Sequence, residues 1–205
     1  MLEKIKVALQ EFKDTYEGAT KIYKEARKDL HDNYRGNMFT VKLTEAKDLY
    51  ENTLKSARID NLAVCVGIID SVREQAKAII SVPVSPEFPA TLEAIKNIKN
   101  PSDAELNGII GNFKNNYVAY RAICDALGGV LNGYVPITYD DIMKDCDVLE
   151  NMLRNCFYSY SVSDYNYRVL LEGDVLDRYD ALFTTFTEGH FDEIVSLEDS
   201  PKEGE

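Results

Sequence analysis

The chain has 205 residues, with 23 Lys and Arg against 35 Asp and Glu, and therefore a formal net charge of −12. Hydrophobic residues make up 45% of it, which excludes a chain that is disordered throughout and allows one domain or two small ones. The excess of acid argues against a surface that binds duplex nucleic acid, because such a surface needs Lys and Arg to displace counterions from phosphates.

An apolar stripe predicts a long helix over about residues 2–33. Its side chains recur at alternating intervals of three and four residues for four repeats, which is typical of a helix that packs on another along one seam. Gly36 follows the stripe and is expected to end the helix. The stripe consists of Leu2, Ile5, Leu9, Phe12, Tyr16, Ala19, Tyr23, Ala26 and Leu30.

A second long helix is predicted from Thr40 or Leu43 to Ile80, so that residues 1–81 form an antiparallel hairpin. Residues 62–69 of this helix read LAVCVGII and are apolar on every side. Because an all-round apolar helix must be covered all round, we expect the C-terminal part of the chain or another chain to pack over this segment.

Three prolines predict an extended linker over residues 82–89, since each proline removes a backbone donor and restrains the residue before it. Short helices are then expected at 90–99, at about 101–127 with Ser102 and Glu105 in a capping box, at 138–157 and at 175–187. Residues 158–168 fit a strand or a Ser-rich loop equally well, and residues 196–205 are expected to be a disordered acidic tail. The predicted fold class is all-α: a long, coiled-coil-like N-terminal hairpin with a smaller C-terminal helical bundle over residues 90–195.

The acidic charge lies almost entirely in the last third of the chain. Residues 1–60 hold 12 basic and 11 acidic residues, residues 61–130 hold six and seven, and residues 131–205 hold five and 17. The hairpin is thus close to neutral, whereas the bundle is acidic from about residue 131. Such an asymmetry separates regions or gives one end of a chain an electrostatic role.

Neither a catalytic motif nor a metal-binding motif is present. The glycine-rich phosphate loops, the Ser-hydrolase elbow and the zinc-protease pattern are all missing, and the four cysteines form no C-x-x-C pair. His190, among carboxylates at 188–193, could act as a general base, but a solvated loop is the preferred interpretation. Asp174, Asp177 and Asp180 leave a divalent-cation site as an alternative, without the spacing of a calcium loop. We therefore expect a non-enzymatic protein with no cofactor.

No stretch reaches the length of a membrane-spanning helix, and the first residues lack the apolar core of a signal peptide. The cysteine usage fits a reducing compartment. The sequence therefore predicts a cytoplasmic protein that does not bind membranes or nucleic acid directly.

Two sets of residues are candidates for protein contacts. The first lies along the hairpin and would contact a second copy or a larger protein: Ile5, Leu9, Phe12, Tyr16, Tyr23, Leu62, Val66 and Ile69. The second is an acidic cluster that could enter a partner's nucleic-acid groove through complementary charge, or only keep the chain soluble: Asp140, Asp141, Asp145, Asp147 and Glu150.

The hairpin sequences LEKIKVALQEF…EARKDL and LTEAKDLYENTLKSARIDNL, followed by PSDAELNGIIGNFKNNYVAYRAI, resemble small helical proteins of tailed bacteriophages that infect low-GC Gram-positive bacteria. The resemblance covers residues 1–127 in style and transfers no site residue. It implies a role in virion assembly or on the virion. Alternatively, it implies an accessory inhibitor of a host system, which the acidic cluster would suit.

Overall fold

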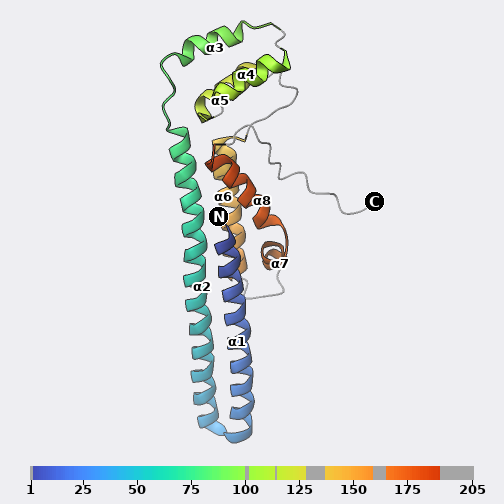
Figure 1. Cartoon of the computed structure of the whole chain (residues 1–205). Helices are drawn as coiled ribbons and strands as arrows, with labels where there is room; N and C mark the ends of the chain where they lie inside the picture. Colours follow the sequence, from blue (N-terminus) through green and yellow to red (C-terminus); the bar gives the residue numbers. More distant parts are fainter. Residues whose placement is uncertain (1, 100–101, 114, 128–136, 159–164, 190–205) are drawn as a thin grey trace, which may run out of the picture. The chain divides into compact units, whose positions relative to one another are not determined.

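The computed structural model describes residues 2–99, 102–113, 115–127, 137–158 and 165–189, and over these residues the chain is helical and contains no strand (Figure 1). The predicted all-α fold class is confirmed for this part of the chain. The helices are α1 (Glu3–Asn33), α2 (Gly36–Ile80), α3 (Phe88–Lys96), α4 (Asp103–Phe113), α5 (Tyr117–Leu127), α6 (Tyr139–Tyr158), α7 (Tyr165–Leu171) and α8 (Val175–Thr187).

The chain divides into two compact units that share three helices. The first unit holds α1, α2 up to Ile69, α6 from Val148 and α7. The second holds the rest of α2, then α3, α4, α5, α6 up to Asp147, and α8 from Asp177. The division therefore runs through helices rather than through the proline-rich residues 82–89.

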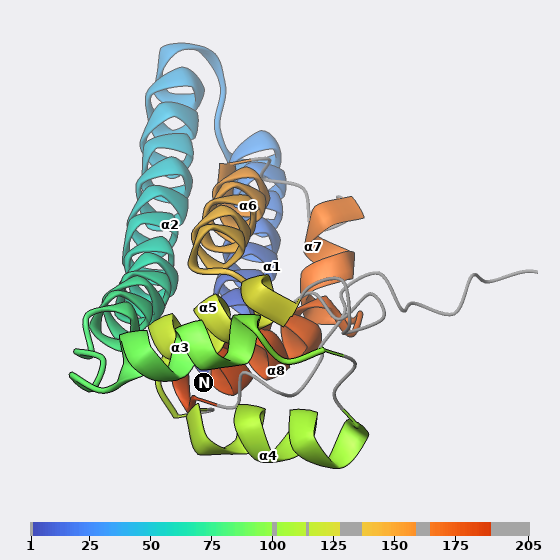
Figure 2. The same cartoon turned by 90° about the horizontal axis from the view of Figure 1, so that it is seen from above.

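α1 and α2 form the predicted antiparallel hairpin, which Figure 1 shows along its length and Figure 2 shows from above. The Tyr23 ring stacks on the Tyr50 ring with centroids 5.0 Å apart, and the hydroxyls of Thr20 and Tyr50 are 3.3 Å apart. Gly36 has φ of +58°, a left-handed conformation that costs glycine little. α2 begins at this glycine, a few residues earlier than the sequence predicts.

The N-terminal half of the α1 stripe belongs to the core of the first unit. Ile5 and Leu9 are fully buried, and Phe12 is 2% exposed. Phe12 meets Phe157 of α6 edge to face, with ring centroids 5.1 Å apart, and α7 also contacts α1. Further along α1 the stripe is only half-buried, at Tyr16, Ala19, Tyr23 and Ala26.

Within the chain, residues 62–69 are not covered on every side, and cover by another chain stays a prediction. Leu62, Cys65 and Ile69 are buried, but Val64 is 49% exposed. Ala63 and Gly67 share the exposed side and present little apolar area. The segment can therefore leave one side open although every residue in it is apolar.

The second unit is built around a cluster of apolar side chains from α3 and α5: Phe88, Ile95, Ala119, Ile123 and Leu127. Phe113 of α4 packs on Phe88 with ring centroids 5.2 Å apart. Elsewhere in the unit, the Tyr117 hydroxyl accepts a hydrogen bond of 2.8 Å from the Tyr139 amide. The Tyr117 ring also meets Phe186 of α8, at 5.3 Å.

The helix predicted over 101–127 is interrupted and forms α4 and α5. Asn116 explains the break, because its side-chain oxygen accepts a 3.0 Å bond from the Ala119 amide and so caps α5, a role that asparagine prefers to a helix interior. Its side-chain nitrogen also donates to the Pro83 carbonyl at 3.1 Å. The Ser102–Glu105 capping box is confirmed, with the Ser102 amide donating to the Glu105 carboxylate at 2.8 Å.

The C-terminal predictions are met in part. α8 spans the predicted residues 175–187, and α7 occupies the end of the segment left open between strand and loop. His190 and the tail at 196–205 lie outside the described residues.

Replacement of Phe12 by alanine tests the core of the first unit. Because Phe12 is buried against Phe157, Phe12→Ala should lower the free energy of unfolding by about 3–5 kcal/mol, as is usual for a buried phenylalanine. Val7→Ala, at a half-exposed position of the same helix, should cost less than about 1 kcal/mol. Urea denaturation followed by circular dichroism measures both, and equal losses would contradict the assignment.

Candidate interaction surface

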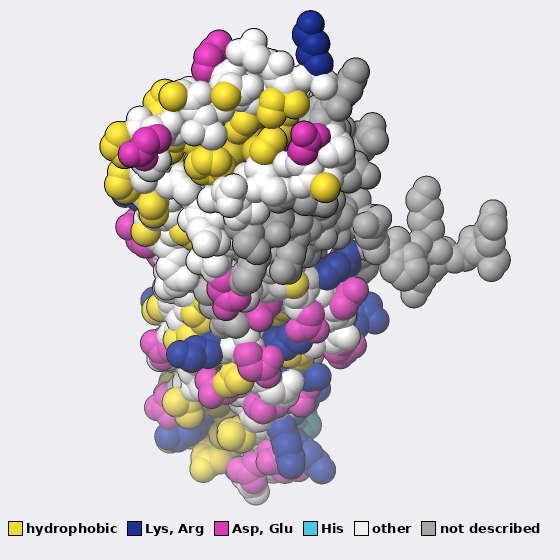
Figure 3. Space-filling view, turned by 45° about the horizontal axis from the view of Figure 1, so that its top comes forward, with side chains coloured by type: hydrophobic (Ala, Val, Ile, Leu, Met, Phe, Trp, Pro, Cys, Tyr) yellow, Lys and Arg dark blue, Asp and Glu magenta, His cyan; other side chains and the backbone are white. Residues whose placement is uncertain are grey.

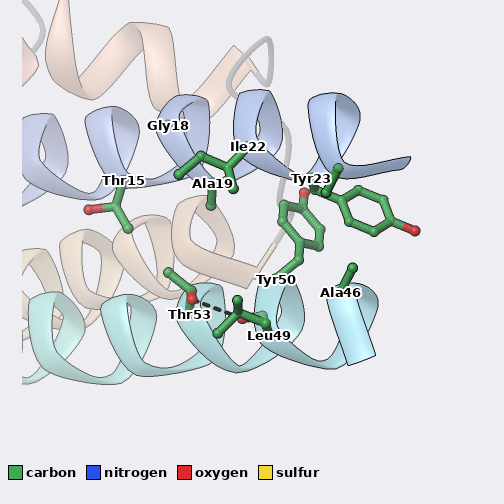
Figure 4. Close-up of a pocket in the computed structure, with 10 residues that line it drawn as sticks. Thr15, Gly18, Ala19, Ile22, Tyr23, Ala46, Leu49, Tyr50 and Thr53 are labelled. Atoms are coloured by element: carbon green, nitrogen blue, oxygen red, sulfur yellow. Dashed lines mark hydrogen bonds between the residues drawn. The ribbon is translucent and has the colours of Figure 1, made fainter. Parts of the chain in front are cut away.

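A groove of about 330 Å³ lies between α1 and α2, on the part of the hairpin nearer its turn. Figure 4 shows Ala19 of α1 pointing toward α2, with Ile22 on α1 and with Leu49 and Thr53 on α2 among the residues that line the groove. Ile22 is 64% exposed and Leu49 is 66% exposed, although both are large and apolar. The lining residues are Thr15, Gly18, Ala19, Ile22, Tyr23, Ala26, Ala46, Leu49, Tyr50 and Thr53.

Small residues in the helix seam produce this groove. The stripe of α1 alternates aromatic residues with alanines, and Ala19, Ala26 and Ala46 are too small to fill the space between two helix axes. Gly18 widens it further, since a Cβ atom added there would meet nothing within 4 Å. Tyr23 and Tyr50 stack within the lining, so the groove has a firm aromatic wall.

The groove faces away from α6. The Arg58 guanidinium lies over the Tyr158 ring of α6, 5.0 Å from its centroid. Leu49 is nine residues before Arg58 on α2, and nine residues make two and a half turns. Leu49 therefore points to the side of α2 opposite to the one that meets α6.

Two further exposed side chains extend the groove along the hairpin. Val7 lies eleven residues before Gly18 on α1, and Val64 lies eleven residues after Thr53 on α2. Eleven residues are close to three full turns, so each valine shares a side with the groove residue of its helix. Both are 49% exposed. We call this surface the open face, made of Val7, Thr15, Gly18, Ile22, Ala26, Ala46, Leu49, Thr53 and Val64.

The charges around the hairpin are mixed in sign. Figure 3 shows Lys and Arg side chains interspersed with Asp and Glu over this part of the chain. Between the open face and the turn of the hairpin, Lys42 pairs with Glu45 at 2.8 Å, and Asp29 accepts a 2.7 Å bond from Asn33. The hairpin surface therefore carries no large field of one sign, unlike the acidic C-terminal third.

Hydrophobic side chains also gather on the second unit, over α3, α4 and α5 in Figure 3. A recess of about 360 Å³ lies there, lined in part by Val84, Phe113 and Asn116. Phe113 packs on Phe88 in this unit, and Asn116 caps α5. The residues of this recess thus have structural roles, whereas Ile22 and Leu49 of the open face are mostly exposed.

The residues predicted along the hairpin fall into two groups. Ile5, Leu9, Phe12, Leu62 and Ile69 are buried within the chain. The others, Tyr16, Tyr23 and Val66, are half-buried, and of these only Tyr23 lines the groove. The sequence analysis missed Ile22 and Leu49. Each is a large apolar residue that lies outside the helix stripe and among charged neighbours, and this pattern could have indicated an exposed contact residue.

The acidic cluster on α6 is engaged in local contacts. Thr138 donates to Asp141 through its hydroxyl at 2.6 Å, and this bond is the main reason why the pKa of Asp141 is lowered. Asp147 pairs with Arg73 at 2.6 Å, and Glu150 pairs with Arg154 at 2.6 Å. Asp145 is half-buried, while Asp140 is exposed. The cluster is therefore less available to a partner than its sequence indicates.

The four cysteines and the carboxylates at 174, 177 and 180 are the remaining candidates for chemistry in the described residues. All four cysteines are buried, and burial raises the pKa of Cys65 to about 12 and that of Cys146 to about 11. Thiols with such values stay protonated and are poor nucleophiles near neutral pH. Within the same residues, which include Asp174, Asp177 and Asp180, no three candidate ligands are grouped to hold a metal ion. The three-carboxylate alternative is therefore not realised.

A search of the described helices for a span that is long and apolar enough to cross a bilayer finds none. Comparison with known proteins finds no matching family model, no matching curated protein and no matching solved structure. The function is therefore argued from the surface of this chain.

The half-buried carboxylate of Asp145 gives a prediction for stability against pH. Burial, and next the charge on Asp141, raise the pKa of Asp145 above the ordinary value of 3.8. A raised carboxylate pKa means that ionisation costs the folded state more than the unfolded one, so this cost is present at pH 7 and absent near pH 3. Asp145→Asn should therefore raise the unfolding midpoint at pH 7 and leave it unchanged at about pH 3.

Thermal unfolding at the two pH values checks this prediction. Asp140→Asn serves as the control: it removes an exposed negative charge from the first turn of the same helix, where such a charge is favourable, so it should not raise the midpoint at pH 7. A stabilisation by Asp145→Asn of the same size at both pH values would contradict the explanation.

Proposed function

We propose that the chain is a non-enzymatic helical protein that acts through protein–protein contacts, and that the open face of its hairpin makes these contacts. The observation that carries the proposal is the exposure of Ile22 and Leu49 on either side of an apolar groove. Contiguous exposed apolar surface rimmed by polar residues marks interaction sites on soluble proteins.

The distribution of burial along the hairpin supports this role. The end near Phe12 is stabilised by contacts with α6 and α7. The opposite end holds two helices with small residues between them, which is a weak arrangement for an isolated hairpin but a suitable one for receiving another helix surface. The apolar side chains there thus add little to the fold of one chain and are available to a partner.

The biological setting of the proposal is virion assembly or a virion-associated role. This setting rests on the resemblance of residues 1–127 to small phage proteins, whereas the contact function rests on the open face. The alternative, an acidic inhibitor that imitates nucleic acid, has less support because Asp141, Asp147 and Glu150 are bound to neighbouring side chains.

Affinity purification from the cells that naturally make the chain tests the proposal. Tagged wild type should retain at least one protein in near-stoichiometric amount, which the double variant Ile22→Lys/Leu49→Lys loses, because buried lysines in an apolar contact are costly. Ile59→Lys is the matched control, since Ile59 is 56% exposed and lies about 80° around α2 from Leu49 and at least 120° from Thr53 and Val64.

Circular dichroism first establishes that the three proteins share one fold. Retention of the same proteins in the same amounts by the double variant would contradict the role of the open face. An untagged copy of the chain, expressed together with the tagged one, is scored separately from all other retained proteins.

A further inference from the structure

We infer that the occupant of the open face is a second copy of this chain, which packs its own open face there about a two-fold axis parallel to the hairpin. The inference rests on the proposed contact function and names its partner. Four observations support it. Exposed apolar residues of α1 and α2 lie at matching heights along the hairpin, and small residues form a groove between the helices. The face has the area of a dimer interface, and its charges are placed to attract a second copy.

The exposed apolar side chains occur as two pairs at matching levels. Tyr50 contacts both Thr20 and Tyr23, so residue 50 of α2 lies level with residues 20–23 of α1. Ile22 and Leu49 are therefore level with each other. Val7 lies 15 residues from Ile22 and Val64 lies 15 residues from Leu49, so the valines form a second level about 22 Å along the hairpin.

This arrangement is self-complementary. An axis parallel to the hairpin places α1 of one copy over α2 of the other at the same level. Ile22 then meets Leu49 of the second copy, and Val7 meets its Val64. The same rotation places Gly18 opposite Thr53, so the small residues that form the groove let two helix surfaces approach closely.

The face is large enough for a dimer. From Val7 to Ala26 it extends about 29 Å, and two helices are about 20 Å wide, which gives roughly 570 Å² of projected area per copy. Specific interfaces bury about 800 Å² of accessible surface per partner, and a projected area understates the accessible one. Two hairpins stacked in this way form a four-helix bundle, a stable way to bury such faces.

The charges favour this orientation of the axis. Asp29 lies seven residues after Ile22, and Lys42 lies seven residues before Leu49, so Asp29 of one copy opposes Lys42 of the other, and the axis repeats this contact at the same level. The hairpin is close to neutral, so two copies of a chain of net charge −12 meet where repulsion is smallest. The same residue counting places Glu11 of one copy opposite Asp60 of the other, and this contact between two negative charges is unfavourable.

Sedimentation equilibrium of the full chain between 1 and 200 µM tests the inference. We expect a monomer–dimer equilibrium within this range and at least a tenfold weaker association for Ile22→Lys. Ile59→Lys, a lysine at an equally exposed position away from the face, should associate as the wild type does.

The Glu11–Asp60 contact tests the orientation of the axis. Asp60→Lys should strengthen the dimer several-fold, because it turns a repulsive contact into an attractive one at two places. Asp48→Lys makes the same change in net charge, but Asp48 is one residue before Leu49 and about 100° around α2, so it should have a smaller effect.

Each outcome decides a separate point. A monomer throughout the range overturns the second copy as occupant and leaves the purification of other proteins as the test of the proposed function. A dimer that Ile22→Lys does not weaken overturns the open face as the interface. Equal effects of Asp60→Lys and Asp48→Lys overturn the axis parallel to the hairpin.

Discussion

The contact between Phe12 and Phe157 is the constraint on which the first unit depends. It joins the hairpin to α6 at 5.1 Å, next to the place where Arg58 covers the Tyr158 ring. Toward the N-terminus of α1 from this contact, the apolar stripe is buried within the chain, with Ile5 and Leu9 fully buried. On the other side the same stripe has only α2 to pack against among the described residues. One heptad pattern thus serves as core at one end and borders a groove at the other.

The hairpin could be predicted because a helix seam leaves a periodic signal. The three-and-four spacing from Leu2 to Leu30 indicates α1, and its contact with α2 follows from the second stripe. The break between α4 and α5 leaves no such signal, because the apolar spacing continues through it. Its cause is the side chain of Asn116, which binds Ala119 in one direction and the distant Pro83 in the other.

The open face could not be predicted from the sequence, for a similar reason. A stripe shows which residues face a neighbouring helix, but it does not show how much of that helix a third element covers. Leu9 and Tyr23 occupy equivalent positions of the heptad, yet the first is buried and the second is half-buried. The difference in burial depends on where α6 ends along the hairpin, which is a property of the tertiary structure. The acidic cluster shows the same limit, since the sequence indicates its charge but not its pairing with Arg73 and Arg154.

Hydrogen exchange measured at different protein concentrations tests the central claim most directly. If the open face pairs with a second copy, amides of residues 15–26 and 46–53 should exchange more slowly at 100 µM than at 1 µM, because association reduces opening of these helices. Amides of residues 119–127 in α5 should exchange at the same rate at both concentrations, since that helix belongs to the second unit and carries no residue of the open face. Exchange that is independent of concentration in both parts of the hairpin would contradict the account.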